Sequence, residues 1–324
     1  MLRGISIALA GLVLAAPAAT GAPHVTMGMG EQSPSMFDDA RFLDTGIRNA
    51  RLILPYDVVR ARGWQLAAAD AWLGAARREG IEPLVTFTAR WGDRRRVHLP
   101  SVREYSRRVA EFHRRYPWVN ELGTWNEANL ASAQPTGHHP RRTAAFYRAL
   151  KRRCRRCTVV ATDVLLTGNW RTWRWLRAFR AAAGRGPHIF GLHNYPDVTR
   201  LVGVRTRNFL RRVRNAEIWI TETGGIVRHR HFKYDESRAD KVVRHVFKLV
   251  AALPRVKRLY LYNWQYDGNV RWDSGFLGQD GKERKAYFAL LDGLALDRFK
   301  PLPTPIDDPV VAPAPDPTQP GPTP

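Results

Sequence analysis

Between residues 24 and 297, short runs rich in β-branched and aromatic residues alternate with longer runs whose apolar residues recur at helical spacing. Val242, Val246 and Val250, for example, form one apolar stripe. Parallel strands must be joined by crossovers, usually helices, so this order predicts a parallel sheet covered by helices. The expected strands are His24–Glu31, Ala50–Asp57, Glu82–Ala89, Glu121–Ala128, Thr158–Leu165, Ile189–Tyr195, Glu217–Thr223 and Val256–Trp264. The expected helices are Gly63–Glu79, Val102–Arg115, Arg141–Arg153, Trp170–Ala183, Thr206–Val213, Ser237–Ala252 and Lys282–Leu294.

Eight strand–helix repeats with short connections predict the α/β class and a single (β/α)8 TIM barrel over residues 23–297. The alternative is an open, doubly wound sheet, which would be expected to carry a glycine-rich phosphate loop after its first strand. The segment Gly28-Met29-Gly30-Glu31 has no third glycine at the required place. The closed barrel is therefore favoured.

Both ends of the chain are expected to lie outside the barrel. Residues 1–22 combine a basic start, an apolar run and small residues, which is typical of a secretory signal peptide. A membrane anchor is the alternative, but the run is short for a span, and we expect a secreted or cell-wall-associated protein without stable membrane insertion. Residues 298–324 are rich in proline, with 10 in the last 24, and predict an extended, disordered tail. The tail could cross a cell-wall layer or have no role.

The chain has two cysteines, Cys154 and Cys157. In an exported protein this spacing favours a small local disulfide. Two thiols alone cannot complete a tetrahedral zinc site. The histidine pairs at 138–139 and 229–231 lack carboxylates at a useful spacing, so no metal site is expected.

The formal net charge of +23 would attract polyanions such as acidic polysaccharide, wall polymers or nucleic acid. The arginines, however, are spread over every helix-like run and are not gathered in one block with interleaved aromatic residues. We therefore expect a solvated basic surface and no specific binding of nucleic acid.

Two expected strands carry a glutamate next to their last residue. These are Glu127 in Gly-Thr-Trp-Asn-Glu-Ala-Asn and Glu222 in Ile-Trp-Ile-Thr-Glu-Thr-Gly-Gly. The carboxyl ends of barrel strands face one site, and two carboxylates facing one cavity are what cleavage of a glycosidic bond requires. At the carboxyl ends of the eight expected strands, the other polar or aromatic residues are Glu31, Asp57, Arg90, Trp91, Asn126, Asp163, His193, Tyr195 and Trp264.

At this point the chain resembles the clan A retaining glycoside hydrolases, with family-5 and family-39 members of exported bacterial type as the nearest pattern. In that clan an Asn-Glu pair ends the fourth strand and a second glutamate ends the seventh; here Asn126-Glu127 and Glu222 occupy those strands. The resemblance implies that Glu127 is the acid/base and that Glu222 is the nucleophile. It covers roughly residues 24–297.

Further residues match the clan pattern. His193-Asn194-Tyr195 resembles an H-x-Y motif at the end of strand six, and Trp264 stands where the clan has an aromatic floor. Arg51 resembles an inward arginine near the nucleophile, with Arg48 as the competing residue. The resemblance implies that Asn126 holds the sugar 2-hydroxyl, while arginine and tyrosine keep the nucleophile ionised. The supporting residues expected are therefore Asn126, His193, Tyr195, Trp264, Arg51 and, as an extension of the aromatic platform, Trp91.

The sequence departs from the clan at Ala128, where many members have proline. The loop after the third strand carries Arg94-Arg95-Arg96, which would suit an acidic glycan if it lined the cleft. Asp57 and Asp163 are interpreted as solvated loop residues or helix caps, and Glu31 is left open between substrate binding and a structural role.

Together these observations predict a monomeric enzyme that hydrolyses O-glycosidic, β-type bonds of a polysaccharide or oligosaccharide, neutral or acidic, with retention and with no metal or organic cofactor. Two alternatives remain open: a catalytically silent carbohydrate-binding barrel, and a transglycosylase that remodels cell-surface glycan. The alternatives to a catalytic role are an arginine-paired glutamate for either Glu127 or Glu222, and ordinary core packing for His193, Tyr195 and Trp264.

Overall fold

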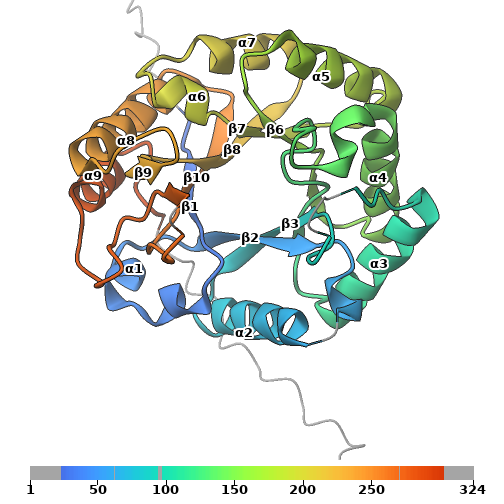
Figure 1. Cartoon of the computed structure of the whole chain (residues 1–324), viewed down its shortest axis with the longest axis horizontal. Helices are drawn as coiled ribbons and strands as arrows, with labels where there is room; N and C mark the ends of the chain where they lie inside the picture. The colour runs from blue at the N-terminus through green and yellow to red at the C-terminus, as the bar shows by residue number, and fades with distance from the viewer. Residues whose placement is uncertain (1–22, 62, 94–96, 270, 303–324) are drawn as a thin grey trace, which may run out of the picture.

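The computed structural model describes residues 23–61, 63–93, 97–269 and 271–302. Its main sheet has nine strands, all parallel, in the order β5-β4-β3-β2-β1-β10-β8-β7-β6. The predicted barrel class is confirmed (Figure 1). The barrel strands are β1 (Thr26–Gly30), β2 (Asn49–Pro55), β3 (Glu82–Thr88), β4 (Glu121–Gly123), β5 (Thr158–Val160), β6 (Asp163–Leu165), β7 (Ile189–His193), β8 (Glu217–Thr223) and β10 (Val256–Tyr262).

The segment expected as the fifth strand closes the barrel. It is broken into β5 and β6 by Ala161 and Thr162; β5 pairs with β4, and β6 pairs with β7. Backbone bonds continue across the break, from the Ala161 amide to Ile189 at 2.9 Å and from the Gly191 amide to Thr162 at 3.0 Å. One continuous segment thus satisfies the backbone groups of both sheet edges, as a closed barrel requires.

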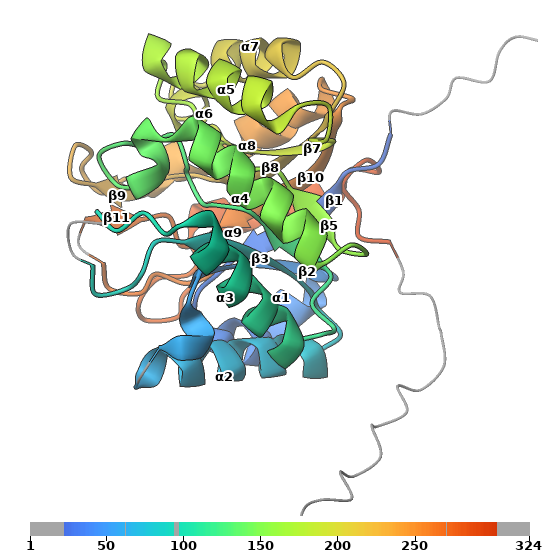
Figure 2. The same cartoon turned by 90° about the vertical axis from the view of Figure 1, so that its right-hand side faces the viewer.

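The helices form a ring outside the strands, as Figures 1 and 2 show. Helix α8 (Glu236–Ala251) illustrates why: Val242, Val246 and Val250 are buried on one face, and the Asp235 side chain caps its first turn. The others are α1 (Ala40–Asp44), α2 (Trp64–Arg78), α3 (Val102–Arg115), α4 (Pro140–Arg153), α5 (Trp170–Ala183), α6 (Tyr195–Val198), α7 (Val204–Arg212) and α9 (Lys285–Leu294), with 3-10 turns at Pro34–Asp38, Val58–Arg60 and Pro135–His138.

Several predicted boundaries were wrong at the carboxyl ends of the strands. Strand β4 ends at Gly123 and not at residue 128, β10 ends at Tyr262 and not at residue 264, and Tyr195 opens α6 instead of closing a strand. In each case the apolar pattern continues past the last ladder bond because the following loop is itself buried. A short antiparallel pair, β9 (Arg228–His229) with β11 (Trp272–Asp273), was not expected.

The amino-terminal half of the barrel interior is filled by the chain itself. Leu84, Val160, Trp219 and Tyr260 form a separate apolar cluster, and a Cβ on Gly28 would lie 2.4 Å from the Tyr260 ring. The interior is therefore packed and not a pore, which leaves the carboxyl-terminal end as the open face for a site.

The two cysteines form the predicted disulfide, with Cα atoms 5.3 Å apart. His113 lies within 4.8 Å of both sulfur atoms, but the disulfide removes the thiolates that a metal would need. Within the described ranges, the protein has no helix long and apolar enough to cross a bilayer. The predicted signal peptide (1–22), the tail beyond residue 302 and the arginines at 94–96 lie outside the described residues.

Candidate active site

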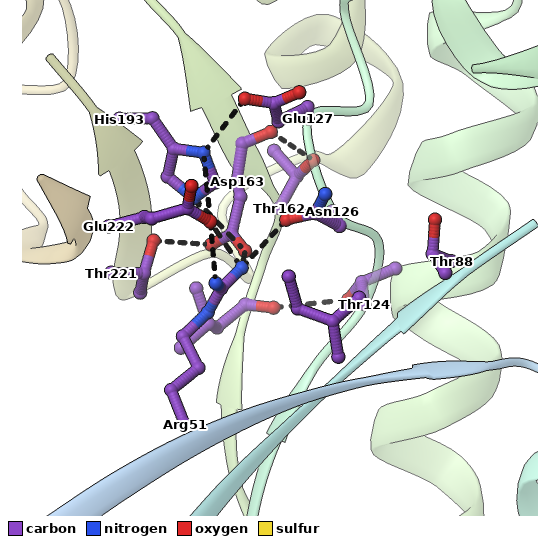
Figure 3. Close-up of polar contacts among 12 residues, drawn as sticks. Arg51, Thr88, Thr124, Asn126, Glu127, Thr162, Asp163, His193, Thr221 and Glu222 are labelled. Atoms are coloured by element: carbon purple, nitrogen blue, oxygen red, sulfur yellow. Dashed lines mark hydrogen bonds and ion pairs between the residues drawn. The ribbon is translucent and has the colours of Figure 1, made fainter. Parts of the chain in front are cut away.

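Arg51 lies at the centre of a polar cluster at the carboxyl end of the barrel (Figure 3). Its side chain points inward from β2 and is only 1% exposed. Its Nη1 donates to Glu222 Oε2 at 2.9 Å, and its Nη2 donates to Asn126 Oδ1 and to Asp163 Oδ2, both at 2.7 Å. The guanidinium of β2 thus joins side chains from β6, from β8 and from the loop after β4.

His193, the last residue of β7, is fully buried and contacts both predicted catalytic glutamates. Its Nδ1 lies 3.1 Å from Glu127 Oε1 and 3.8 Å from Glu222 Oε2, and its Nε2 lies 3.7 Å from Asp163 Oδ2. Burial alone would lower the imidazole pKa, but these three carboxylates outweigh it and raise the pKa of His193 to about 9. The three carboxylates thus favour the protonated form of the ring.

Asp163 is the residue whose role the sequence interpretation missed. It was interpreted as a solvated loop residue or a helix cap, but it opens β6 and is fully buried. Burial would raise its pKa, yet Arg51 and His193 hold the pKa of Asp163 down at about 2. Thr221 donates to its Oδ1 at 2.8 Å. A Cβ on Gly191 would lie 1.8 Å from the same oxygen, so glycine is required there.

Glu222 lies near the end of β8 and is held from two sides. Arg51 pairs with Oε2, and the Tyr195 hydroxyl donates to Oε1 at 3.2 Å. Burial and the adjacent Glu222 carboxylate raise the pKa of Tyr195 well above its ordinary value, so the phenol remains a donor. The Glu222 side chain is 13% exposed, which leaves it in reach of solvent and ligand.

Glu127 follows β4 in the loop and has a left-handed backbone, with φ at 44°. This conformation is uncommon outside glycine and persists only where the surroundings enforce it. The flanking amides do so: Asn126 N–H donates to Phe87 O at 2.8 Å, and Ala128 N–H donates to Asp163 O at 3.1 Å. The Glu127 side chain is turned toward His193 and is 19% exposed.

The two predicted tryptophans lie apart from this cluster. The Trp264 side chain is only 1% exposed and packs edge-on against Phe42 and Tyr287. Its ring faces are therefore taken up by the protein core. Trp91 is 38% exposed and stacks on Trp64, with ring centroids 5.2 Å apart.

Two acidic strand-end residues have structural partners. Glu31 is 4% exposed and accepts hydrogen bonds from the backbone amides of residues 32, 33, 264 and 265, which fastens the loop after β10. Asp57 pairs with Arg90 at 2.6 Å. These contacts assign Glu31 the structural role that the sequence left open.

Two aromatic residues near Glu222 were not found from the sequence. Tyr262 is the last residue of β10 and is half-buried. Burial has the largest effect in raising the pKa of its phenol, and the carboxylates of Glu222 and Glu31 raise it further. Trp272 meets Tyr195 edge-on, with ring centroids 4.9 Å apart. No strand-end signal marks Trp272, because it reaches the site through the β9–β11 pair in a long loop.

Two basic side chains, Arg51 and His193, offset most of the negative charge of the three carboxylates in this cluster. Arg51 occupies the position between Asp163 and Glu222 that a cation would take, and His193 provides the positive charge next to Glu127. The arrangement therefore presents two partly exposed carboxylates, each fixed by a buried cationic or phenolic donor, at one edge of the barrel.

No protein-family model matches the chain, and no curated protein matches it in sequence. Solved structures match in fold. The GH5_18 protein of Streptomyces cattleya in complex with GlcNAc aligns with a TM-score of 0.59 at 14% identity, over 85% of this chain and 80% of that one.

Two further solved structures align over most of both chains. One of two fungal β-1,4-galactanases aligns with a TM-score of 0.63 at 11% identity, over 83% of this chain and 99% of that one. Native xylanase 10B from Thermotoga maritima aligns with a TM-score of 0.59 at 9% identity, over 84% and 95%. At these identities the likeness concerns the fold alone, the (β/α)8 barrel.

Proposed function

We propose that the protein is a glycoside hydrolase that cleaves β-type O-glycosidic bonds of a polysaccharide or oligosaccharide with retention of configuration. The observation that supports the proposal is the contact of His193 with both glutamates, at 3.1 Å to Glu127 and 3.8 Å to Glu222. The two glutamate oxygens concerned can be no farther apart than the sum of these contacts, about 6.9 Å. This bound is compatible with the ~5–5.5 Å separation of the two carboxyl groups in retaining enzymes.

Glu222 is assigned as the nucleophile. It must be ionised to attack the anomeric carbon, and the Arg51 guanidinium and the Tyr195 hydroxyl both favour the carboxylate. Both donors are buried and held in place, so they stabilise charge without reorganising during the reaction.

Glu127 is assigned as the acid/base. It would protonate the departing oxygen in the first step and deprotonate the attacking water in the second. His193 adjoins it as a cation at neutral pH, which stabilises the carboxylate that remains after the proton has left. Asn126 presents its amide NH2 to a sugar hydroxyl while its oxygen is held by Arg51.

Export and action outside the cell remain part of this proposal, resting on the signal-like sequence of residues 1–22. The metal-free mechanism follows from the two carboxylates, which supply both acid and nucleophile.

The test is chromatography of products from a panel of neutral and acidic polysaccharides, with wild type beside Glu222→Gln. The proposal expects products from wild type only, with the new reducing ends first seen as the β-anomer by proton NMR. Products formed equally by Glu222→Gln would refute the nucleophile assignment. Binding without products throughout the panel would favour the silent carbohydrate-binding barrel, and longer products than the substrate would favour transglycosylation.

Glu127→Gln separates the two roles. An aryl β-glycoside of the sugar that the panel identifies, with dinitrophenolate as the leaving group, needs no proton from the enzyme. The variant should therefore release dinitrophenol in a rapid first turnover and then stall, whereas natural substrate should show no such turnover. Loss of the first turnover as well would contradict the acid/base assignment.

A further inference from the structure

A groove runs along the outside of the barrel between α5 and α7, which lie side by side in Figure 2. Its central cavity has a volume of 420 Å³ and is lined mainly by tryptophan and arginine. We call this surface the arginine groove and define it by Trp170, Trp173, Arg174, Arg177, Arg180 and Arg212.

The arginine groove continues into two neighbouring hollows. A cavity of 590 Å³ shares Trp170 and Arg174 with it and extends to Asn129, only two residues after Glu127. A cavity of 380 Å³ shares Arg180 and continues toward the opposite end of the barrel. Helix α5 follows β6 and therefore begins at the carboxyl-terminal face of the barrel, where the glutamates lie. The groove thus begins near the carboxyl-terminal face of the barrel and leads away from it along α5.

The arginines of the groove have no acidic partner. Arg174, Arg177, Arg180 and Arg212 are exposed, and within the described part of the chain none of them forms an ion pair. The described residues lining all three hollows include no aspartate or glutamate. Some surface arginines elsewhere are paired with carboxylates, as Arg244 is with Asp240 and Asp292. The groove therefore concentrates uncompensated positive charge.

The tryptophans hold part of this charge in place. Trp170 is 60% exposed, with the guanidinium carbon atoms of Arg171 and Arg174 each 5.8 Å from its ring centroid. The guanidinium carbon of Arg212 lies 4.4 Å from the ring centroid of Trp173. Stacking on an indole restrains a guanidinium, and restrained guanidinium groups bind carboxylates as a planar fork. An exposed indole also offers an apolar surface to the C–H side of a sugar ring.

Arg174, Arg177 and Arg180 recur at three-residue steps on α5, so their stems rise by roughly 4.5 Å and turn by about 60° around the helix axis at each step. A row of charges of this kind suits a polymer that carries one negative charge on each repeating unit. Restrained arginines, an exposed indole and continuity with the glutamate site together favour a carboxylated polysaccharide over nucleic acid.

We propose that the arginine groove is a binding surface for an acidic polysaccharide of the polyuronate class, held next to the glutamate site. The binding surface does not require that the glutamates cleave the bound strand. It therefore goes beyond the proposed hydrolysis and can be tested with the inactive Glu222→Gln protein.

The test is isothermal titration of polygalacturonate oligomers into the full chain at about 150 mM salt. The triple variant R174Q/R177Q/R212Q should raise Kd at least tenfold. The matched control is R103Q/R107Q/R114Q on α3, which removes the same charge from exposed arginines on another part of the barrel. This control should raise Kd less than threefold, and both triple variants should keep the wild-type unfolding midpoint because the six side chains are exposed.

Trp170→Ala should raise Kd about fivefold without changing the net charge, and Glu222→Gln should leave Kd within twofold of wild type. Equal losses in the two triple variants would show that binding is a general effect of net charge and would overturn the proposal. Tighter binding of duplex DNA than of polygalacturonate, with the same dependence on Trp170, would also overturn it. If Kd behaves as expected but no polysaccharide is cleaved, the proposed hydrolysis fails alone.

Discussion

The buried carboxylate of Asp163 lies 2.7 Å from the guanidinium of Arg51, which in turn donates to Glu222 at 2.9 Å. Asp163 and Arg51 are each at most 1% exposed, so their charges compensate each other almost without water. A buried pair of this kind is worth little as stabilisation compared with an apolar core, but it is costly to break. Its value here is positional: it fixes the cation that holds Glu222.

Asp163→Asn should therefore impair the enzyme indirectly, by loosening the Arg51 side chain that holds Glu222. We expect kcat/KM to fall about 10–100-fold and the free energy of unfolding to fall by about 3 kcal/mol, because a buried arginine loses one of its two charged partners. The pKa of His193 should also fall below about 9, because Asp163 is one of the groups that raise it. Steady-state kinetics, urea titration and an NMR titration of the imidazole measure these effects. A His193 pKa unchanged at about 9, together with unchanged kcat/KM, in a fully folded variant would contradict the positioning role.

Gly191→Ala should be among the most damaging single methyl additions in this barrel. The new Cβ would lie 1.8 Å from Asp163 Oδ1, so the carboxylate or the strand must move. We expect a loss of at least about 3 kcal/mol in the free energy of unfolding, the upper part of the range for overpacking. The matched control is Gly186→Ala, where the nearest atom outside its neighbours, on Tyr147, would lie 3.5 Å away. Equal unfolding curves for the two variants would refute the packing argument.

His193 should make stability depend on pH in the alkaline range. Its folded pKa of about 9 is above the ordinary value of 6.5, so the folded state holds the proton more tightly than the unfolded state. The stabilisation is fully present below about pH 6.5 and is lost as the pH rises through about 9. The charged groups facing the ring are Glu127, Asp163, Glu222 and Arg51. Urea titrations at several pH values should show this loss in wild type and a smaller one in His193→Gln; identical profiles would contradict the assignment.

Tyr195→Phe should affect turnover more than folding. The variant removes the hydroxyl that donates to Glu222 Oε1 and keeps the ring that packs against Trp272. We expect kcat to fall about tenfold, with the free energy of unfolding lowered by about 1 kcal/mol, as for one lost hydrogen bond. A variant that loses stability but keeps kcat would assign Tyr195 to packing alone.

The strand–helix alternation predicted the barrel because each strand is short, apolar and bounded by breakers, and these are local properties. The ends of the predicted strands also placed Glu127, Glu222 and His193 at one end of the barrel, while the family resemblance added Arg51, and the structure brings these four together. Strand-end position is thus sufficient to gather a site when the strands are parallel.

What sequence could not supply was burial and the course of long loops. Asp163 follows a break between two short strands, and nothing in its neighbours shows that Gly191, 28 residues later, leaves a space for its carboxylate. Trp264 shows the opposite case: it stands beyond the last ladder bond of β10, where the loop turns its side chain into the core and not toward the cluster. Both depend on three-dimensional packing that a local pattern does not contain.

The most direct test of the central claim is mass spectrometry of the enzyme quenched during turnover of a 2-fluoro aryl β-glycoside of the sugar that the panel identifies. The fluorine slows both steps, and the good leaving group keeps the first one fast enough for a glycosyl-enzyme to accumulate. The account predicts one added glycosyl mass, located on the peptide that carries Glu222 and absent from Glu222→Gln. A label on Glu127, or continued turnover of the natural substrate with no label at all, would contradict it.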